Sequence, residues 1–290
     1  MERLIYTNAL GHSVEFSSAG TYQWTQVDDL GALDASFQTS SSPYQDGTTS
    51  VGDPYFEPRV IKVDIQIVSS DLQADIRSLN RILNPKLGMA SLSYERDGVK
   101  RVLNKVKTRT MPALPGGTSR GIGFQMSSII FMAFNPYYTD EAYTEASVET
   151  GGLGLEFPLN ITDSFVFDFL NTTGVTVTNA GDVECPVTII LDGPMASPLE
   201  VENITTGEKI VLAATLLANE RLMITTEIDN INVIKKNLTT SVETVAFQYI
   251  DVAQTTFFYL TMGTNTMRIT ADEAEMENAT IKFKQQYVGV

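Results

Sequence analysis

The sequence predicts a mainly β protein with two domains, the first of which carries the single α-helix. Short segments of alternating apolar and polar residues recur along the whole chain, and only one stretch repeats at helical spacing. In the second half, turn signals separate most of these segments at intervals of about ten residues, a spacing typical of a β-sandwich. A chain of 290 residues, 43% of them hydrophobic, can bury two cores. We place the domain boundary between residues 150 and 151.

The first domain is expected to open with three strands and a long excursion. Leu4–Tyr6, Val14–Phe16 and Tyr22–Val27 have the composition of strands. Gln38–Phe56 is rich in Ser, Thr, Gly, Pro and Asp, and its Asp46-Gly47 pair favours a turn with positive φ. We expect a long loop or a protruding hairpin here, and loops of this length are usually functional or ordered by a partner.

A strand and the helix follow this excursion. Val60–Val68 alternates strongly, which predicts a strand with one buried face. Ser70 is expected to cap the next helix, Asp71–Leu83, with Gln73 reaching back to complete a capping box. Asn84-Pro85 ends it. One side of the helix is apolar: Leu72, Ile76, Leu79 and Leu83.

Three more strands complete the first domain. Ala90–Tyr94 and Val99–Thr108 flank an Asp-Gly turn, and Ile129–Phe134 is a short apolar run that is far too short to span a bilayer. Asn135-Pro136 stops this run, because proline cannot donate to a strand ladder. Together the elements describe a β domain, β-sandwich or split-barrel-like, with one α-helix.

The second domain, residues 151–290, is expected to be a β-sandwich. Phe165, Phe167 and Phe169 alternate, and so do Val175 and Val177. The remaining strand candidates are Val187–Leu191, Leu199–Val201, Lys209–Leu212, Glu220–Thr225, Asn232–Ile234, Phe257–Leu260, Thr266–Ile269 and Thr280–Phe283.

Charge argues against a nucleic-acid-binding protein. The net charge is −15, and it is uneven: residues 1–150 hold 13 basic and 17 acidic residues, whereas residues 151–290 hold 7 and 18. A surface this acidic repels phosphate backbones. The N-terminus has no long apolar core and no small-residue cleavage site, so we expect no signal peptide and folding in a reducing cytoplasm.

No constellation of residues predicts catalysis, a cofactor or a metal site. His12 is the only histidine and lies in an early turn, and Cys185 is the only cysteine and has apolar neighbours. Gly121-Ile122-Gly123 lacks the third glycine of a dinucleotide loop. The acidic run 272–277 lacks the alternation and glycine of a calcium loop, which favours a solvated turn. We therefore expect no enzyme, although acid pairs of a hydrolase cannot be recognised from spacing alone.

A basic stripe stands out in this acidic chain. Lys105, Lys107 and Arg109 are expected to share one face of a strand, with Lys100 and Arg101 nearby. Two interpretations are open. The charges could protect the edge of a sheet from unwanted pairing, or they could contact an acidic neighbouring subunit.

The order of several short motifs resembles one family, the distal tail proteins of siphophages, which are the phages with long, non-contractile tails. The resemblance extends over nearly the whole chain. It includes the alternating strand that leads into the helix at Asp71–Leu83. The other segments are Asn8–Gly11, Pro43 to Gly47, Phe134–Tyr138, Asn179–Gly181, Cys185–Ile189, Asn203–Gly207 and Gly263–Met267.

This resemblance implies a structural role at the tail tip. Residues 1–150 would form a homo-hexameric ring at the end of the tail tube, and residues 151–290 would be a peripheral galectin-like β-sandwich. The ring would join the tail tube protein to the baseplate hub, the tail-associated protein and the receptor-binding protein, with DNA only passing through its lumen. The protein would lie in the virion, at the tail tip, without membrane insertion. The expected inter-subunit contacts are Pro43, Tyr44, Asp46, Gly47, Tyr55, Phe56, Lys105, Lys107 and Arg109.

A carbohydrate-binding module for the host surface is the alternative function. A galectin-type sugar site needs a histidine and a tryptophan in the sandwich, but His12 and Trp24, the only ones here, are both in the first half. Sugars could still stack on Tyr137, Tyr138 or Phe258 if these rings are exposed.

Overall fold

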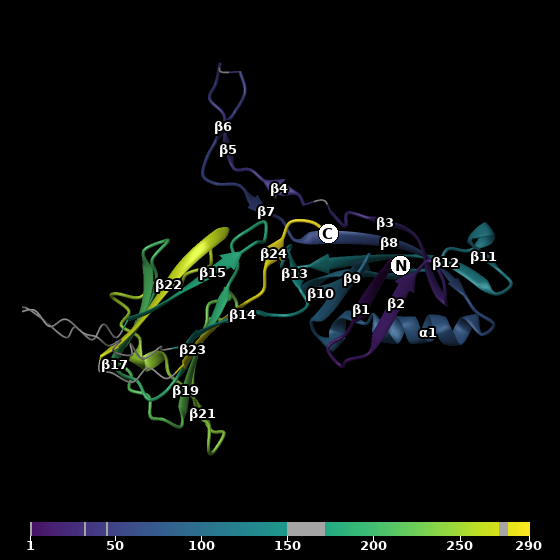
Figure 1. Ribbon diagram of the computed structural model, residues 1–290. Helices are drawn as coiled ribbons and strands as arrows, with labels where there is room; N and C mark the ends of the chain where they lie inside the picture. The colour runs from purple at the N-terminus through teal and green to yellow at the C-terminus, as the bar shows by residue number, and fades with distance from the viewer. Residues whose placement is uncertain (1, 32, 45, 150–171, 273–277) are drawn as a thin grey trace, which may run out of the picture. The chain divides into compact units, whose positions relative to one another are not determined.

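The computed structural model describes the chain except for residues 1, 32, 45, 150–171 and 273–277. It forms two compact units (Figure 1). Unit 1 comprises Met1–Glu141 and Gln286–Val290, and unit 2 comprises Ala142–Gln285. Nearly all of the regular structure is strand, and the described residues contain one α-helix. The predicted fold class is confirmed, whereas the expected alternation at Phe165–Phe169 and most of the acidic run 272–277 lie outside the described residues.

A closed ring of strands forms the body of unit 1. In spatial order the strands are β12, β8, β3, β2, β1, β9 and β10, and β10 pairs back onto β12. The contact between β2 and β3 is a single parallel pair, Ser17 with Gln23, whereas the other contacts are antiparallel. The bounds are β1 Arg3–Thr7, β2 Ser13–Ser17, β3 Tyr22–Asp28, β8 Arg59–Val68, β9 Ala90–Arg96, β10 Val99–Ala113 and β12 Phe124–Ala133.

The core of this barrel follows directly from sequence alternation. In β8, Ile61, Val63, Ile65 and Ile67 all point inward and are buried. At the centre, the rings of Tyr6 and Phe131 stack with their centroids 5.3 Å apart. Such aromatic pairs stabilise a core beyond the area that they bury.

Helix α1, Leu72–Ile82, covers the barrel with its apolar side and begins one residue later than the capping box predicts. The cap is Asp71, whose carboxylate accepts a hydrogen bond from the Ala74 main-chain N–H at 3.1 Å. The Ser70 prediction is wrong because a carboxylate at the next position satisfies the helix N–H groups and also suits the positive end of the helix dipole. The apolar side is as expected, with Leu79 and Leu83 fully buried.

Shorter elements extend unit 1. The turns η1 Pro85–Leu87 and η2 Gly117–Ser119 follow α1 and β10, and η2 leads into β11 Arg120–Gly121, which pairs with β12. The C-terminal β24 Gln286–Tyr287 pairs with β13 Tyr138–Asp140, so the last five residues return to unit 1. The excursion between β3 and β8 carries β4 Ala35–Ser36, β5 Thr39–Ser40, β6 Thr49–Ser50 and β7 Tyr55–Phe56.

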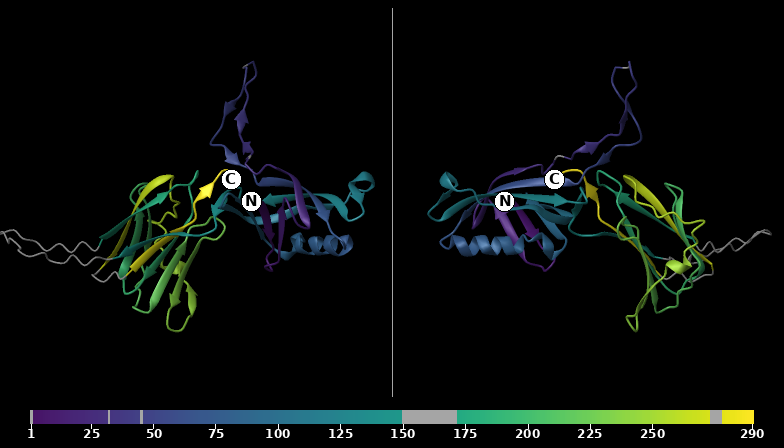
Figure 2. Two further views of the ribbon diagram at one scale, coloured as in Figure 1. Left: turned by 45° about the vertical axis from the view of Figure 1, so that its right-hand side comes forward. Right: turned by 180° about the vertical axis from the view of Figure 1, so that it is seen from behind.

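Unit 2 is a β-sandwich of a six-stranded and a four-stranded sheet (Figure 2). The inward-facing residues of both sheets meet in one core. The strands of the first sheet lie side by side in the order β14 Thr144–Glu149, β23 Asn278–Phe283, β16 Val187–Asp192, β19 Glu220–Thr225, β20 Asn232–Asn237 and β21 Glu243–Val245. The second sheet contains β15 Thr172–Asn179, β22 Gly263–Asp272, β17 Ala196–Asn203 and β18 Glu208–Leu212, and the turn η3 spans Phe247–Tyr249.

One predicted strand of unit 2 is wrong. Phe257–Leu260 forms no strand, and Leu260 makes only an isolated bridge with Cys185, with main-chain hydrogen bonds of 2.9 and 3.1 Å. The alternation in this segment is real, because Phe258 and Leu260 are both buried in the sandwich core. A segment can thus bury every second residue without a neighbouring strand to pair with along its length.

Candidate interaction surfaces

The residues first considered for catalysis do not come together. His12 is exposed in a turn, where its main-chain N–H donates to the Asn8 side-chain oxygen at 3.0 Å. Cys185 is buried in unit 2, and burial, helped by the charge of Glu184, raises the pKa of its thiol to about 12. Within the described ranges, no group of three or more His, Cys, Asp and Glu side chains could hold a metal ion. No helix among the described residues is long and apolar enough to cross a bilayer.

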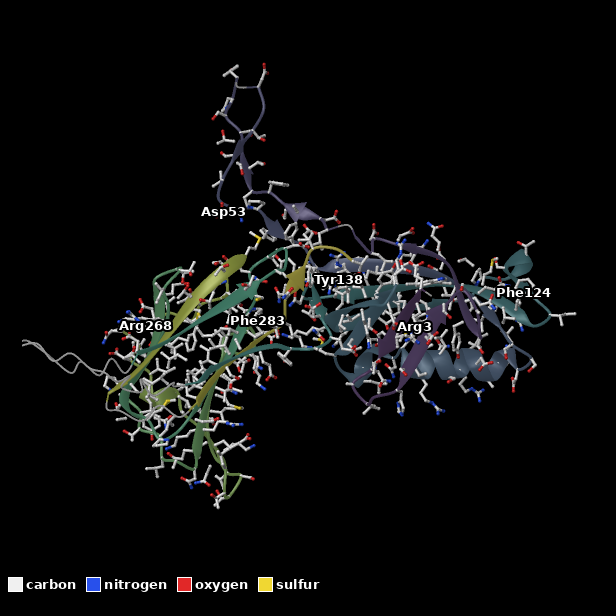
Figure 3. The ribbon with its side chains drawn as sticks, in the orientation of Figure 1. Arg3, Asp53, Phe124, Tyr138, Arg268 and Phe283 are labelled. Carbon is white, nitrogen blue, oxygen red and sulfur yellow. The ribbon has the colours of Figure 1, made fainter. Side chains whose placement is uncertain are left out.

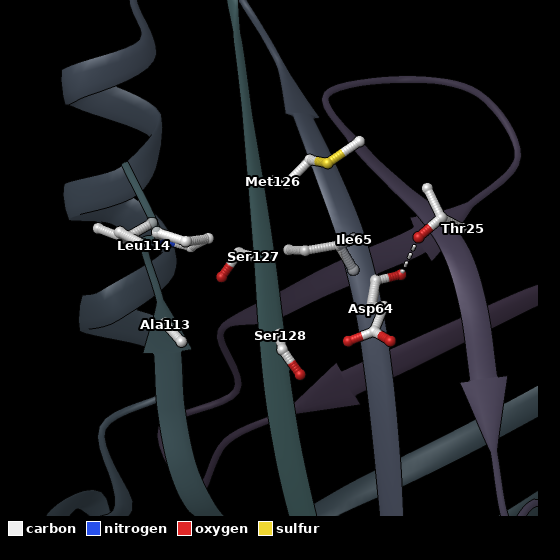
Figure 4. Close-up of a pocket in the computed structure, with 9 residues that line it drawn as sticks. Thr25, Asp64, Ile65, Ala113, Leu114, Met126, Ser127 and Ser128 are labelled. Carbon is white, nitrogen blue, oxygen red and sulfur yellow. Dashed lines mark hydrogen bonds between the residues drawn. The ribbon is translucent and has the colours of Figure 1, made fainter. Parts of the chain in front are cut away.

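A hollow of about 630 Å³ opens on the barrel surface where β10 leaves β12 (Figure 4). Its walls include Thr25, Asp64, Leu114, Met126 and Ser128. Burial opposes ionisation of the Asp64 carboxyl, but hydrogen bonds from Lys62 and Ser128 outweigh it and hold the pKa below its ordinary value. The hollow thus offers one ionised acid among apolar and hydroxyl neighbours.

The predicted excursion in unit 1 is a protruding hairpin, which we call the arm and define as residues 34–57. β4 pairs with β7, and β5 pairs with β6. The outgoing and returning sides of the hairpin are further joined by main-chain hydrogen bonds from Val51 N–H to Gln38 O and from Glu57 N–H to Asp34 O. The arm projects away from the barrel in every view (Figures 1 and 2). Asp53, on the returning side of the arm between β6 and β7, is labelled in Figure 3.

The arm carries several apolar side chains that are largely exposed. Tyr44 at its end is fully exposed and has a positive φ of 64°. Phe37, Val51 and Tyr55 are each more than half exposed. The Phe56 ring meets the Tyr137 ring edge-on, with the two ring centroids 6.1 Å apart. Within the predicted contact set, Pro43, Asp46 and Gly47 are also exposed. A two-stranded ribbon of this kind is marginal in water on its own, so its apolar side chains favour a second surface that covers them.

The basic stripe lies along β10, where that strand is irregular. Lys105 has a positive φ of 58° at a bulge in the pairing with β9, and Arg109 lies at a second register shift, in the pairing with β12. Buried Val106 and Thr108 alternate with the stripe, so Lys105, Lys107 and Arg109 all avoid the core. Beyond Val106, β10 pairs only with β12 within the described part of the chain. Lys107 and Arg109 therefore lie on a strand segment with one open side, a position that fits both edge protection and a subunit contact.

Two aromatic residues considered for sugar stacking are not available to a ligand. Tyr138 and Phe258 are each only 1% exposed. Tyr138 lies under the Arg59 guanidinium, and Phe258 belongs to the core of the sandwich. That part of the sugar-binding interpretation is wrong, because apolar alternation marks these rings for burial rather than display.

Comparison with known proteins gives one family match, in the second half of the chain. Residues 180–287, most of unit 2, match the sequence model of the family described as siphovirus-type tail component, C-terminal domain. Over these residues, unit 2 is similar to a siphovirus-type tail-component C-terminal domain. The predicted resemblance to phage distal tail proteins is thereby confirmed. A search of curated proteins gives no match for the chain.

Solved structures extend the likeness over both units of the chain. The SPP1 Dit (gp 19.1) protein, described as a paradigm of the hub adsorption apparatus in phages that infect Gram-positive bacteria, matches with a TM-score of 0.70 at 12% identity over 99% of each chain. Chains of the phage P2 baseplate in its activated conformation, with Ca and with Sr, match with TM-scores of 0.58 and 0.55 at 13% and 12% identity, each over 100% of both chains. At these identities the likeness concerns the fold.

Proposed function

We propose that the chain is a structural hub protein of a phage tail that assembles into a homo-hexameric ring. Unit 1 forms the ring at the distal end of the tail tube, and unit 2 is the peripheral platform on which baseplate and receptor-binding proteins dock. The family match of unit 2 and the fold shared with SPP1 Dit support this assignment. The observation that carries self-assembly is the arm, a protruding hairpin that carries Phe37, Tyr44, Val51 and Tyr55 largely exposed.

The arm and the opposite end of the barrel supply the two different patches that a ring requires. A ring forms when one patch of a subunit binds a different patch of the next. The arm joins β8 at Arg59, and the nine steps of β8 from Arg59 to Val68 span about 30 Å. There, next to the hollow beside β12, exposed apolar side chains gather: Val68, Leu114, Ile122 and Met126. We infer that this end receives the arm of the neighbouring copy.

Charge suits a ring through which DNA passes. Six copies at −15 each would carry −90. Acidic walls repel DNA phosphates rather than neutralising them, so passing DNA would not be held. The protein would act within the virion, at the tail tip, and no catalytic step is part of this function.

The mass of the purified protein in solution tests the ring. Six chains of 31.8 kDa give about 191 kDa, and we expect this mass by light scattering, with an annulus and a central hole in negative-stain images. A 31.8 kDa species at every concentration and salt would count against self-assembly. If the chain assembles only when neighbouring tail proteins are added, the ring proposal stands, and those proteins are needed to close the ring.

Charge reversal of the basic stripe separates its two interpretations. If Lys105, Lys107 and Arg109 hold an acidic neighbour, changing all three to Glu should dissociate the ring while the circular dichroism of the monomer stays unchanged. The matched control reverses three exposed positive charges elsewhere in unit 1: Arg77→Glu and Arg81→Glu in α1, together with Lys86→Glu in η1. If the ring survives the reversal of the stripe, the three charges do not hold the subunits together, and they protect the edge of the sheet instead.

A further inference from the structure

Arg59 is a buried cation at the point where the arm meets the barrel. It is only 2% exposed and is the first residue of β8, two positions after the arm ends. Its guanidinium lies over the Tyr138 ring, 4.7 Å from the centroid. Burial lowers the pKa of Arg59 from its ordinary value, although the charges of Tyr138 and Asp29 oppose this shift. Such a buried charge is tolerated only where hydrogen bonds replace its water.

The hydrogen bonds of Arg59 join three separate segments of the chain. Its Nε donates to the Pro136 carbonyl at 2.9 Å, and Nη1 donates to the Leu30 carbonyl at 2.9 Å and to the Asp29 carbonyl at 3.3 Å. Nη2 donates to the carbonyl of Val288, in the C-terminal tail. Asp29 and Leu30 lie in the segment that leads into the arm, so one side chain ties together the segments on both sides of the arm, the β12–β13 connection and the tail.

Neighbouring contacts hold the same segments. Phe56, at the base of the arm, contacts Tyr137, and Gly289 in the tail lies beside Gly31, where a Cβ added to Gly289 would be at van der Waals distance, 3.9 Å, from the Gly31 main chain. The tail itself is fixed to unit 1, because β24 pairs with β13 and the Arg101 guanidinium lies 3.6 Å from the Tyr287 ring centroid. The Phe134–Tyr138 motif, singled out in the sequence, thus builds the seat for this cluster.

We propose that Arg59 and the segment 135–138 form a clasp that holds the root of the arm, and that the C-terminal tail, residues 286–290, closes it. With the tail docked, the arm root is ordered; with the tail undocked, Arg59 loses one of its carbonyl acceptors and the Gly31 side of the root loses its packing. The chain leaves unit 1 after β13 and returns to it at β24. Whether β24 is paired with β13 therefore decides whether the root of the arm is held in place. This coupling belongs to the single chain and does not require a ring.

Hydrogen–deuterium exchange on the full chain tests the clasp, at a concentration where all variants show the same mass. The reporter is the Glu57 amide, which donates to the Asp34 carbonyl at the base of the arm. We expect deletion of residues 286–290, and separately Arg59→Lys, to speed exchange there by roughly tenfold or more, because a lysine cannot span several carbonyls. Strands β1 and β9 should keep their protection. The exposed Arg77→Lys is the matched control and should change neither.

Three results decide the proposal. Faster exchange at the arm root in both variants, with no further increase when the two changes are combined, supports one coupled clasp. An unchanged Glu57 amide after deletion of the tail would overturn it. Exchange that rises equally in the arm root, β1 and β9 would also overturn it, because Arg59 and the tail would then support the barrel in general rather than the arm.

Discussion

Replacing the end of the arm, residues 38–51, with a short Gly-Ser turn is expected to abolish the ring and leave a folded 31.8 kDa chain. The physical reason is the distribution of apolar side chains. The arm contributes no residue to the barrel core, so its removal leaves that core intact, whereas it carries exposed Phe37, Tyr44, Val51 and Tyr55, of which the replacement removes Tyr44 and Val51. Interfaces concentrate their binding energy in a few such anchors, and aromatic side chains are enriched among them.

Light scattering and circular dichroism together read this outcome. A matched control removes another exposed hairpin end, residues 238–241 between β20 and β21 of unit 2, which should leave the mass of the assembly unchanged. A narrower pair of variants refines the contact. Tyr44→Ala should weaken the assembly, and so should Met126→Asp at the proposed receiving end. An intact hexamer in the arm replacement would show that the subunits bind through another surface.

Local patterns predicted most elements of this fold. The alternation of Val60–Val68 correctly predicted β8, and the apolar spacing around Leu79 correctly predicted the buried side of α1. The Asp46-Gly47 pair indicated a turn, and the arm is a hairpin with Gly47 at a positive φ of 85°. These features depend on residues close in sequence, which is why one chain suffices to read them.

Features that depend on distant parts of the chain were not readable. Nothing local to Gln286–Tyr287 shows that this segment pairs with β13, nearly 150 residues earlier. Arg59 has the sequence pattern of an ordinary strand-edge charge, yet it is buried because four carbonyls from three segments converge on it. The same limit produced the wrong strand at Phe257–Leu260, where burial is local but a pairing partner is not.

The site predictions divide in the same way. The arm could be singled out because its composition is unsuited to a core, and Tyr44 is indeed exposed. The basic stripe could be placed on a strand, but the bulge at Lys105 and the open side beyond Val106 arise from the closure of the barrel. Which of these residues touch a neighbour is a property of two copies, and it stays a prediction for the assembly experiments.

Phe131→Ala is expected to destabilise unit 1 by about 3–5 kcal/mol, the usual cost of removing a fully buried aromatic ring. Phe131 is 1% exposed and lies in β12, the strand on which the barrel closes. Its ring stacks on Tyr6 and lies 6.3 Å from the ring of Phe16, so its loss leaves a cavity bounded by rigid aromatic neighbours. Rigid aromatic neighbours move little to fill the space that the ring leaves, so the free-energy cost of the cavity stays large.

The position of Trp24 makes this effect measurable in unit 1 alone. Trp24 is the only tryptophan and packs against the barrel core, so its fluorescence during urea unfolding reports unit 1 and not unit 2. The matched control is Phe134→Ala, three residues along, where the ring is about half exposed and the expected cost is below about 1 kcal/mol. Equal losses for the two variants would contradict the barrel core described here, because only one of the two rings fills its centre.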